Sequence, residues 1–93
     1  MIEVLEGPGE ITILLKEERL DAVNSQSFLV YLRDLDPGDS KVAIDLRQIR
    51  HIDSSGLGAL LALHKRFGAA MVVKNPSRQV ARVFELTNLT KVE

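Results

Sequence analysis

The sequence predicts a single small α/β domain, with a mixed, mostly parallel β-sheet and helices packed largely on one face. Three observations lead to this expectation. The 93 residues suffice for one hydrophobic core, and no linker or internal repeat divides them. Short apolar segments alternate with amphipathic ones, in the order strand–strand–helix–strand–helix–strand–helix. Right-handed crossovers between such strands make neighbours parallel, so only the initial hairpin should be antiparallel.

The elements of the first half are marked by alternation and by turn residues. Residues 2–5 and 11–15 are expected as two strands, joined by a hairpin turn at Gly7-Pro8-Gly9. A helix should follow residues 21–24, which include possible N-cap residues. Apolar side chains then recur at helical spacing, at Phe28, Tyr31, Leu32 and Leu35. A Pro-Gly turn at residues 36–39 should end this helix.

The second half repeats the alternation with clearer signals. Residues 42–46 form the most apolar strand, which suits a central position in the sheet. A helix is expected over residues 57–67, with Gly68 closing it, and a buried strand over residues 71–73. Asn75-Pro76-Ser77 predicts the start of a third helix, with Asn75 or Ser77 as its cap. Residues 89–92 are expected as a last short extended segment.

Composition excludes several classes of function. A net charge of −1 gives no general attraction to nucleic acid or to an anionic membrane. The absence of cysteine excludes disulfides, thiolate metal sites and cysteine catalysis. The longest apolar run, residues 57–63, is far shorter than the roughly 20 residues that span a bilayer. The alternating N-terminus does not resemble a signal peptide. We therefore expect a cytoplasmic protein, with no direct nucleic-acid binding and no membrane insertion.

The most informative segment is Asp53-Ser54-Ser55-Gly56, a turn that leads from the strand of residues 42–46 into an apolar helix. This turn lies at the C-terminal edge of the expected sheet, where α/β folds collect functional loops. A hydroxyl at a helix N-terminus could cap the helix, act as a nucleophile or carry a phosphate. We expect Ser54 to be the cap.

Catalysis is the least supported of these readings. The Gly-x-Ser-x-Gly pattern of a nucleophile elbow is absent, and nothing directs His51, three residues before Ser54, at its hydroxyl. His51 and His64 are thirteen positions apart without further ligands, which does not indicate a metal site. The loop matches neither a Walker motif nor a dinucleotide fingerprint. We expect a protein that is not an enzyme and has no cofactor or metal. Capping alone, worth about 1 kcal/mol, leaves the paired serines unexplained.

The same residues carry a resemblance to a known family. Asp45-Leu46, followed by Ile52-Asp53-Ser54-Ser55-Gly56-Leu57-Gly58, resembles the signature of the STAS domain, typified by bacterial anti-sigma factor antagonists. Leu20-Asp21 is similar to the Gly-x-Leu-Asp turn that precedes the first helix of that family. Residues 72–77 and 80–89 are similar to its last strand-to-helix passage and third helix. Residues 1–93 are therefore expected to form one STAS domain.

The resemblance implies a protein switch. In that family an anti-sigma factor kinase phosphorylates the first serine of the pair, which corresponds to Ser54. The unphosphorylated protein binds the kinase and frees a sigma factor for transcription, phosphorylation ends the binding, and a phosphatase restores it. ATP and Mg²⁺ would belong to the kinase. The residues expected to bind the partner are Asp21, Asp53, Ser54, Ser55, Gly56 and Leu57.

Three departures from the family pattern keep a second function open. Glu18 replaces the glycine of the Gly-x-Leu-Asp turn, and residues 57–70 are about one helical turn shorter than is typical. The sequence stops at Glu93, where many relatives continue, so a C-terminal helix is expected to be absent. The apolar surface left by that helix would be a candidate homodimer contact. The alternative function is a non-switching STAS scaffold or assembly subunit of a stress-signalling or lipid-transport complex, with Ser54 only a cap.

Overall fold

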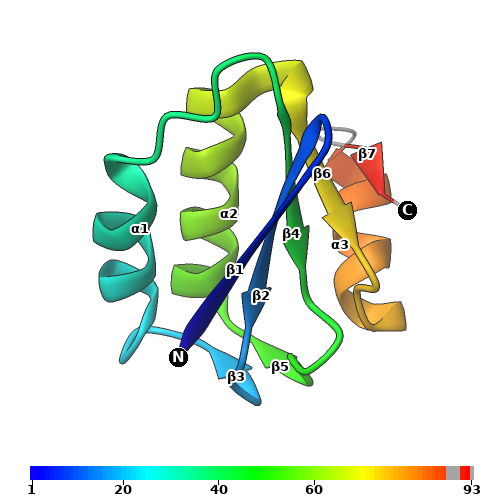
Figure 1. Cartoon of the computed structure of the whole chain (residues 1–93). Helices are drawn as coiled ribbons and strands as arrows, with labels where there is room; N and C mark the ends of the chain where they lie inside the picture. The colour runs from blue at the N-terminus through cyan, green and yellow to red at the C-terminus, as the bar shows by residue number, and fades with distance from the viewer. Residues whose placement is uncertain (88–90, 93) are drawn as a thin grey trace.

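The structure is a computed structural model that describes residues 1–87 and 91–92 (Figure 1). Its strands are β1 (Ile2–Gly7), β2 (Glu10–Leu15), β3 (Arg19–Leu20), β4 (Lys41–Asp45), β5 (His51–Ile52), β6 (Met71–Lys74) and β7 (Lys91–Val92). Its helices are α1 (Ser25–Arg33), α2 (Ser54–Phe67) and α3 (Arg78–Thr87), and a short 3₁₀ turn, Gly68–Ala70, follows α2.

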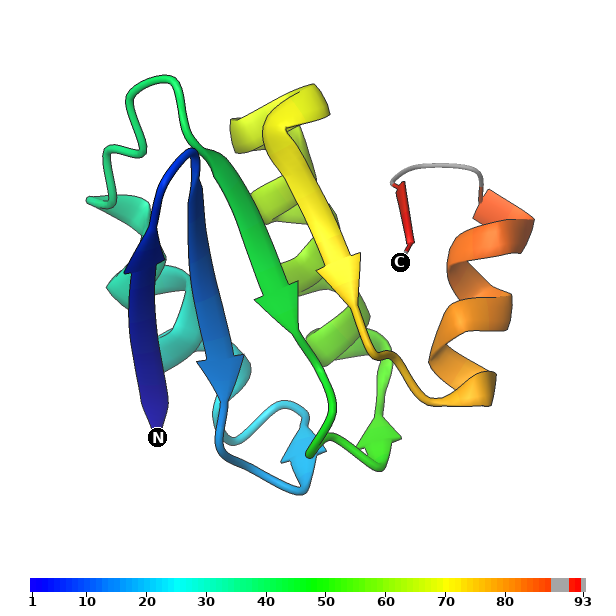
Figure 2. The same cartoon turned by 45° about the vertical axis from the view of Figure 1, so that its right-hand side comes forward.

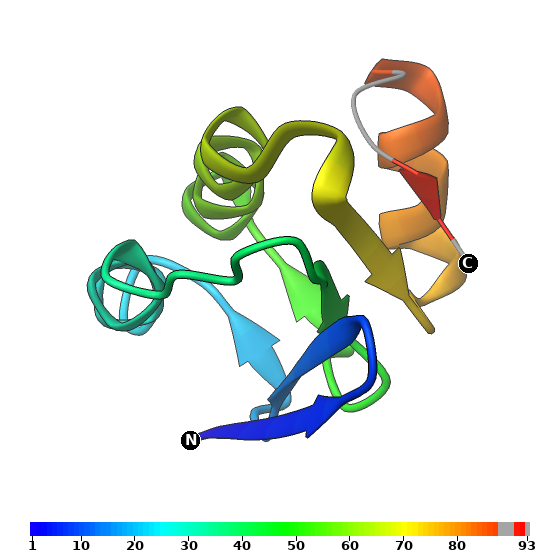
Figure 3. The same cartoon turned by 45° about the horizontal axis from the view of Figure 1, so that its top comes forward.

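The main sheet has the strand order β1-β2-β4-β6-β7. Only the β1–β2 hairpin is antiparallel, and the remaining neighbours are parallel. Helices α1 and α2 lie side by side on one face, and α3 lies beside the β6–β7 edge (Figures 1, 2 and 3). The predicted mixed, mostly parallel sheet with helices largely on one face is confirmed. A separate parallel pair, β3 and β5, lies at the end of the sheet next to the start of α2.

The core lies between the sheet and its helices, and it follows the alternation of the strands. In β2 the buried residues are Ile11, Ile13 and Leu15, while the residues between them are half-buried. The helical contribution comes from apolar residues spaced by three or four positions, which share one face of a helix. These residues are Phe28 and Leu32 of α1, Ala59, Leu60 and Leu63 of α2, and Val80 and Phe84 of α3.

Several element boundaries differ from the sequence prediction. The pair β3–β5 was not predicted, and α2 begins at Ser54, three residues before the predicted start. Tyr31 has the predicted apolar spacing but is 53% exposed. Gly68 ends α2 as predicted, with φ of 59°, and the Ser77 hydroxyl accepts the Val80 N–H to cap α3 (3.3 Å). Residues 88–90 and 93 lie outside the described residues, so the expected dimer contact at this end stays a prediction.

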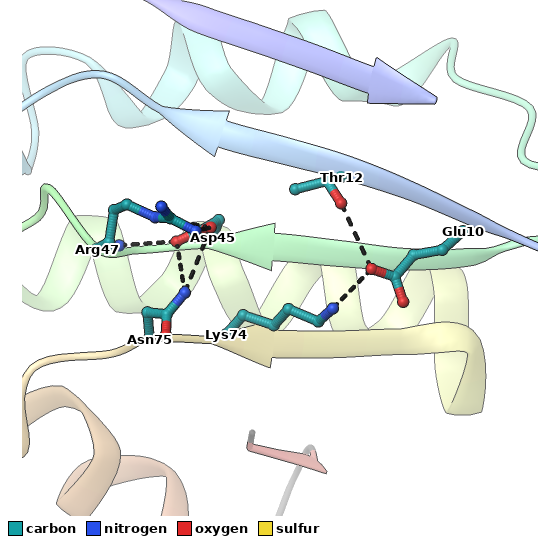
Figure 4. Close-up of polar contacts among 6 residues, drawn as sticks. All are labelled: Glu10, Thr12, Asp45, Arg47, Lys74 and Asn75. Carbon is teal, nitrogen blue, oxygen red and sulfur yellow. Dashed lines mark hydrogen bonds and ion pairs between the residues drawn. The ribbon is translucent and has the colours of Figure 1, made fainter. Parts of the chain in front are cut away.

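The face of the sheet opposite α1 and α2 carries a polar cluster around Asp45 (Figure 4). The Asp45 side chain is only 3% exposed. It accepts the Arg47 backbone N–H (3.0 Å), the Arg47 guanidinium through Nε (3.0 Å) and Nη2 (2.7 Å), and Nδ2 of Asn75 (3.3 Å). Burial raises the pKa of Asp45, but the hydrogen bonds from Arg47 and Asn75 outweigh it and hold the pKa below its usual value. Asp45 thereby fixes the chain that leaves β4 toward the β5 pair.

Candidate functional site

Asp53, and not a serine, caps helix α2. Its backbone is extended (φ −105°, ψ −173°), and its Oδ1 accepts the N–H of Gly56 at 2.9 Å. Its carbonyl accepts the N–H of Leu57 at 2.9 Å, which is the first bond of the helix. The expectation that Ser54 is the cap is therefore wrong. A carboxylate at the N-cap satisfies an otherwise unpaired N–H and also interacts favourably with the helix dipole.

The second oxygen of Asp53 reaches across to another part of the chain. Oδ2 accepts the N–H of Ala22 at 3.3 Å, and the Asp53 N–H in turn donates to the carbonyl of Leu20 at 3.3 Å. One residue thus holds both the first turn of α2 and the loop between β3 and α1. Because the two segments are 31 positions apart, this connection is a tertiary contact.

Ser54 and Ser55 are both exposed on the first turn of α2. Neither hydroxyl has a hydrogen bond to the residues that the structure describes. A side chain at this position is close to the positive end of the helix dipole, which favours an anionic group. Because Asp53 occupies the cap, the Ser54 hydroxyl is accessible and not engaged in holding the fold.

Gly56 lies on the buried side of the same turn, where the helix touches β3. A Cβ atom built on Gly56 would lie 2.1 Å from the carbonyl oxygen of Leu20 and 2.9 Å from Cγ1 of Ile52. Any larger residue would push these segments apart. Gly56 therefore permits the close approach that keeps the serines next to the β3–α1 loop.

The loop next to the serines is held by its own hydrogen bonds. Asp21 Oδ1 accepts the N–H of Val23 (2.9 Å), and Asn24 Oδ1 accepts the N–H of Asp21 (2.9 Å). Asn24 Nδ2 donates to the carbonyl of Arg19 (2.7 Å). These bonds present Val23 to solvent with 89% of its surface exposed.

Of the six residues predicted to bind a partner, the structure brings Asp21, Asp53, Ser54 and Ser55 to one surface. Gly56 is buried, and Leu57 is half-buried and packs against the core. Sequence reasoning missed Ala22 and Val23, which lie in the same loop. The signal for Val23 was available, because a lone β-branched residue stands in the polar turn Asp21-Ala22-Val23-Asn24.

The geometry does not assemble a hydrolytic site at Ser54. His51 lies on β5, pairs with Arg19 and has no hydrogen bond to Ser54. The described residues contain no group of three or more His, Asp or Glu side chains that could hold a metal ion. None of the described helices is long and apolar enough to cross a membrane. The site is a surface built from a loop and a helix N-terminus.

Comparison with known protein families gives one match that spans nearly the whole sequence. The model of the STAS domain matches residues 3–93. The chain belongs to the STAS domain family. A Thermotoga maritima protein, assigned provisionally as an anti-sigma factor antagonist, is 28% identical over 88 residues, covering 89% of this chain and 78% of that protein. Its homologue in Thermotoga neapolitana is 27% identical over 88 residues, with the same coverage.

Solved structures show the same STAS fold. A crystal structure of a provisionally assigned anti-sigma factor antagonist from Thermotoga maritima superposes with a TM-score of 0.77 at 24% identity, covering 98% of this chain and 84% of that one. The unphosphorylated form of the anti-sigma factor antagonist SpoIIAA gives 0.76 at 17% identity, covering 100% and 87%. The murine anion transporter Slc26a9 gives 0.71 at 19% identity, covering 95% of this chain but only 16% of the transporter.

Proposed function

We propose that this STAS domain is an anti-sigma factor antagonist switched by phosphorylation of Ser54. While unphosphorylated it binds an anti-sigma factor kinase through the loop of residues 21–24 and the first turn of α2. Transfer of phosphate from ATP on the kinase to the Ser54 hydroxyl ends this binding, and a phosphatase restores the free hydroxyl. The names of the Thermotoga relatives and the fold shared with SpoIIAA support this role.

The observation that carries the proposal is the assignment of the cap to Asp53. A serine that capped α2 would need its hydroxyl to hold the helix, and its modification would cost stability. Here Asp53 makes the capping bond to Gly56, while Ser54 is exposed and has no hydrogen bond to described residues. The hydroxyl can therefore accept phosphate while the helix keeps its cap.

The charge around Ser54 explains how a phosphate would act on a partner. The carboxylates of Asp21 and Asp53 already make this surface acidic, and both are fixed by backbone N–H donors. A phosphoserine adds about −1.5 to −2 charges at neutral pH. The helix N-terminus tolerates this charge, but an interface that has matched a neutral hydroxyl would face repulsion and desolvation. Each 1.4 kcal/mol lost there weakens binding about tenfold.

The test uses a purified anti-sigma factor kinase together with ATP. One phosphate should be added, and fragment mass spectrometry should locate it on Ser54. Ser54→Ala should still bind the kinase without being modified, and Ser54→Asp should fold but bind much more weakly. Ser55→Ala is the matched control, which should be phosphorylated like the wild type. No modification, with equal binding by all variants, would contradict the switch.

The alternative is a STAS domain that works as a constitutive assembly subunit, with partner binding independent of Ser54. The same fold within the Slc26a9 transporter shows that this domain also occurs as one part of a larger protein. Equal partner affinity of the Ser54→Ala and Ser54→Asp variants, with no phosphate incorporated, is the result that would favour this function over the switch.

A further inference from the structure

An apolar cavity of about 260 Å³ opens between α1 and the β1–β2 edge of the sheet, and Ser54 is not among the residues that line it. Core residues form its floor, namely Leu15, Leu20, Phe28 and Ile49, each no more than 3% exposed. Ser27 and Tyr31 of α1 lie at its rim. The cavity therefore offers buried apolar surface directly beside β1. Strand β1 lies at one edge of the main sheet (Figure 3).

The volume limits what can occupy this cavity. Pockets that enclose a whole drug-sized molecule usually measure about 300–1,000 Å³. A cavity of about 260 Å³ is smaller, and its walls are mainly apolar side chains. It therefore suits one large apolar side chain better than an entire small ligand.

Strand β1, beside the cavity, has backbone N–H and C=O groups that are not paired with β2. The Lys16 N–H donates to the Met1 carbonyl at 2.8 Å, and Gly7 and Glu10 face each other across the turn of the hairpin. In an antiparallel pair the residues that turn their N–H and C=O groups toward the partner strand alternate. The backbone N–H and C=O groups of residues 1, 3, 5 and 7 therefore point toward β2. Those of Ile2, Val4 and Glu6 point away from β2, toward the outer side of β1, where no described strand pairs with it.

The negative charge of residues 1–18, around the edge of the sheet at β1, indicates the charge that a partner should carry. Residues 1–18 contain five glutamates and a single lysine. Three of these glutamates are paired: Glu3 with Lys16 at 2.5 Å, Glu10 with Lys74 at 2.6 Å, and Glu17 with the N-terminal ammonium. Glu6 and Glu18 are exposed without an ion-pair partner among the described residues. A segment with Lys or Arg would complement this excess of negative charge.

We propose that β1 and the adjacent cavity bind an extended basic peptide segment of a partner protein. The segment adds a strand to the free edge of β1, pairs with the outward groups of Ile2, Val4 and Glu6, and seats one large apolar side chain in the cavity. Strand addition gives affinity through the main chain, and a pocket for a particular side chain gives specificity. This docking surface does not use Ser54, although Asn24, which lines the cavity, also belongs to the loop of residues 21–24.

The experiment selects peptides on the full chain from a displayed library of random sequences. Enriched peptides should share one large apolar residue flanked by Lys or Arg. When a selected peptide is synthesised and added to the isotope-labelled protein, the backbone amide signals of Ile2, Val4 and Glu6 should shift in NMR spectra. Replacing its apolar residue with serine should weaken binding about tenfold or more.

Two variants of the protein test the geometry. Ser27→Trp places a large side chain at the mouth of the cavity and should weaken the selected peptide about tenfold or more. Gln26→Trp, on the neighbouring exposed position of α1, is the matched control and should bind normally. Val4→Pro removes an N–H that faces outward, which an edge strand tolerates, and it should also weaken binding. If Val4→Pro does not fold, Ser27→Trp decides the outcome. Ser54→Asp should bind the peptide like the wild type. The test of peptide binding therefore holds even if Ser54 proves not to be a phosphorylation site.

Three results would overturn the proposal. The first is a selection that enriches no peptides, or peptides without the apolar and basic pattern. The second is equal binding by the wild type and Ser27→Trp. The third is self-association of the protein through β1, seen as a dimer in sedimentation that Val4→Pro converts to a monomer, which would make a second copy of the chain the occupant.

Discussion

Replacing Gly56 with alanine tests whether the close contact between α2 and β3 holds the site together. The added methyl group would lie 2.1 Å from the carbonyl oxygen of Leu20 and 2.7 Å from its carbonyl carbon. These are backbone atoms, so relief requires movement of β3 or of the first turn of α2. Gly58, two positions later in the same helix, provides the matched control, because a methyl group added there would meet nothing within 4 Å.

The expected magnitude follows from two opposing effects. Alanine stabilises a helix interior by about 1 kcal/mol relative to glycine. Forcing extra volume into a packed site costs about 1–3 kcal/mol, and contact with backbone places Gly56→Ala at the upper end of that range. Gly56→Ala should therefore lower the free energy of unfolding by about 2 kcal/mol, and Gly58→Ala should raise it by about 1 kcal/mol.

Urea unfolding followed by circular dichroism measures both variants. In a domain of this size a loss of about 2 kcal/mol corresponds to a fall in melting temperature of about 8–16 °C. The two substitutions are chemically identical, so their difference isolates the contact with Leu20. Equal midpoints for Gly56→Ala and Gly58→Ala would show that the approach of α2 to β3 is looser than described, and the structural role given to Gly56 would be refuted.

Substitutions at three further positions test the capping, buried-charge and phosphate-site assignments. Asp53→Ala should lower the free energy of unfolding by about 1–2 kcal/mol because the α2 cap is lost. Asp53→Asn should retain most of the stability of the wild type, because asparagine is also a good N-cap. Equal urea midpoints for the wild type and both Asp53 variants would contradict the cap. Because the pKa of Asp45 is lower in the folded protein than in the unfolded chain, its charged form stabilises the fold above about pH 4, and this contribution is lost as the pH falls through the lower folded value. Asp45→Asn should therefore be less stable at neutral pH and lose less stability on acidification than the wild type; parallel pH profiles of the urea midpoint would argue against this. Ser54→Asp adds negative charge to the first turn of α2 and should leave the free energy of unfolding unchanged or raise it by about 0.3–1 kcal/mol; a clear loss in calorimetry would show that the hydroxyl supports the fold.

The sequence was sufficient to predict the layered α/β architecture because the signals for its main elements are local. The hairpin turn at Gly7-Pro8-Gly9 and the apolar run that became β4 each appear within a few residues. The pair β3–β5 could not be found in this way. Each strand has two residues, too few for alternation to be visible, and they pair across a separation of 32 positions.

The residues predicted to cap and surround the start of α2 lie there in the structure, but the predicted capping residue was wrong. The motif predicted a hydroxyl at the start of a helix, and either Asp53 or the serines could have capped it by propensity, since all are favoured there. The choice depends on the extended backbone of Asp53 and on the Ala22 N–H, which a distant segment supplies. The spacing of Tyr31 predicted a buried side chain, but Tyr31 lines the open cavity beside α1 and is 53% exposed.

The contacts between β3 and the start of α2 also determine which molecules of this protein a partner can recognise. The surface around Ser54 exists only after segments more than thirty residues apart have met, through the Ala22–Asp53 and Leu20–Asp53 hydrogen bonds. A nascent or partly unfolded chain has the same serine in the same sequence but lacks this surface. A partner that reads the shape, and not the linear motif, would therefore ignore incomplete and damaged copies, so its occupancy would report the number of folded molecules.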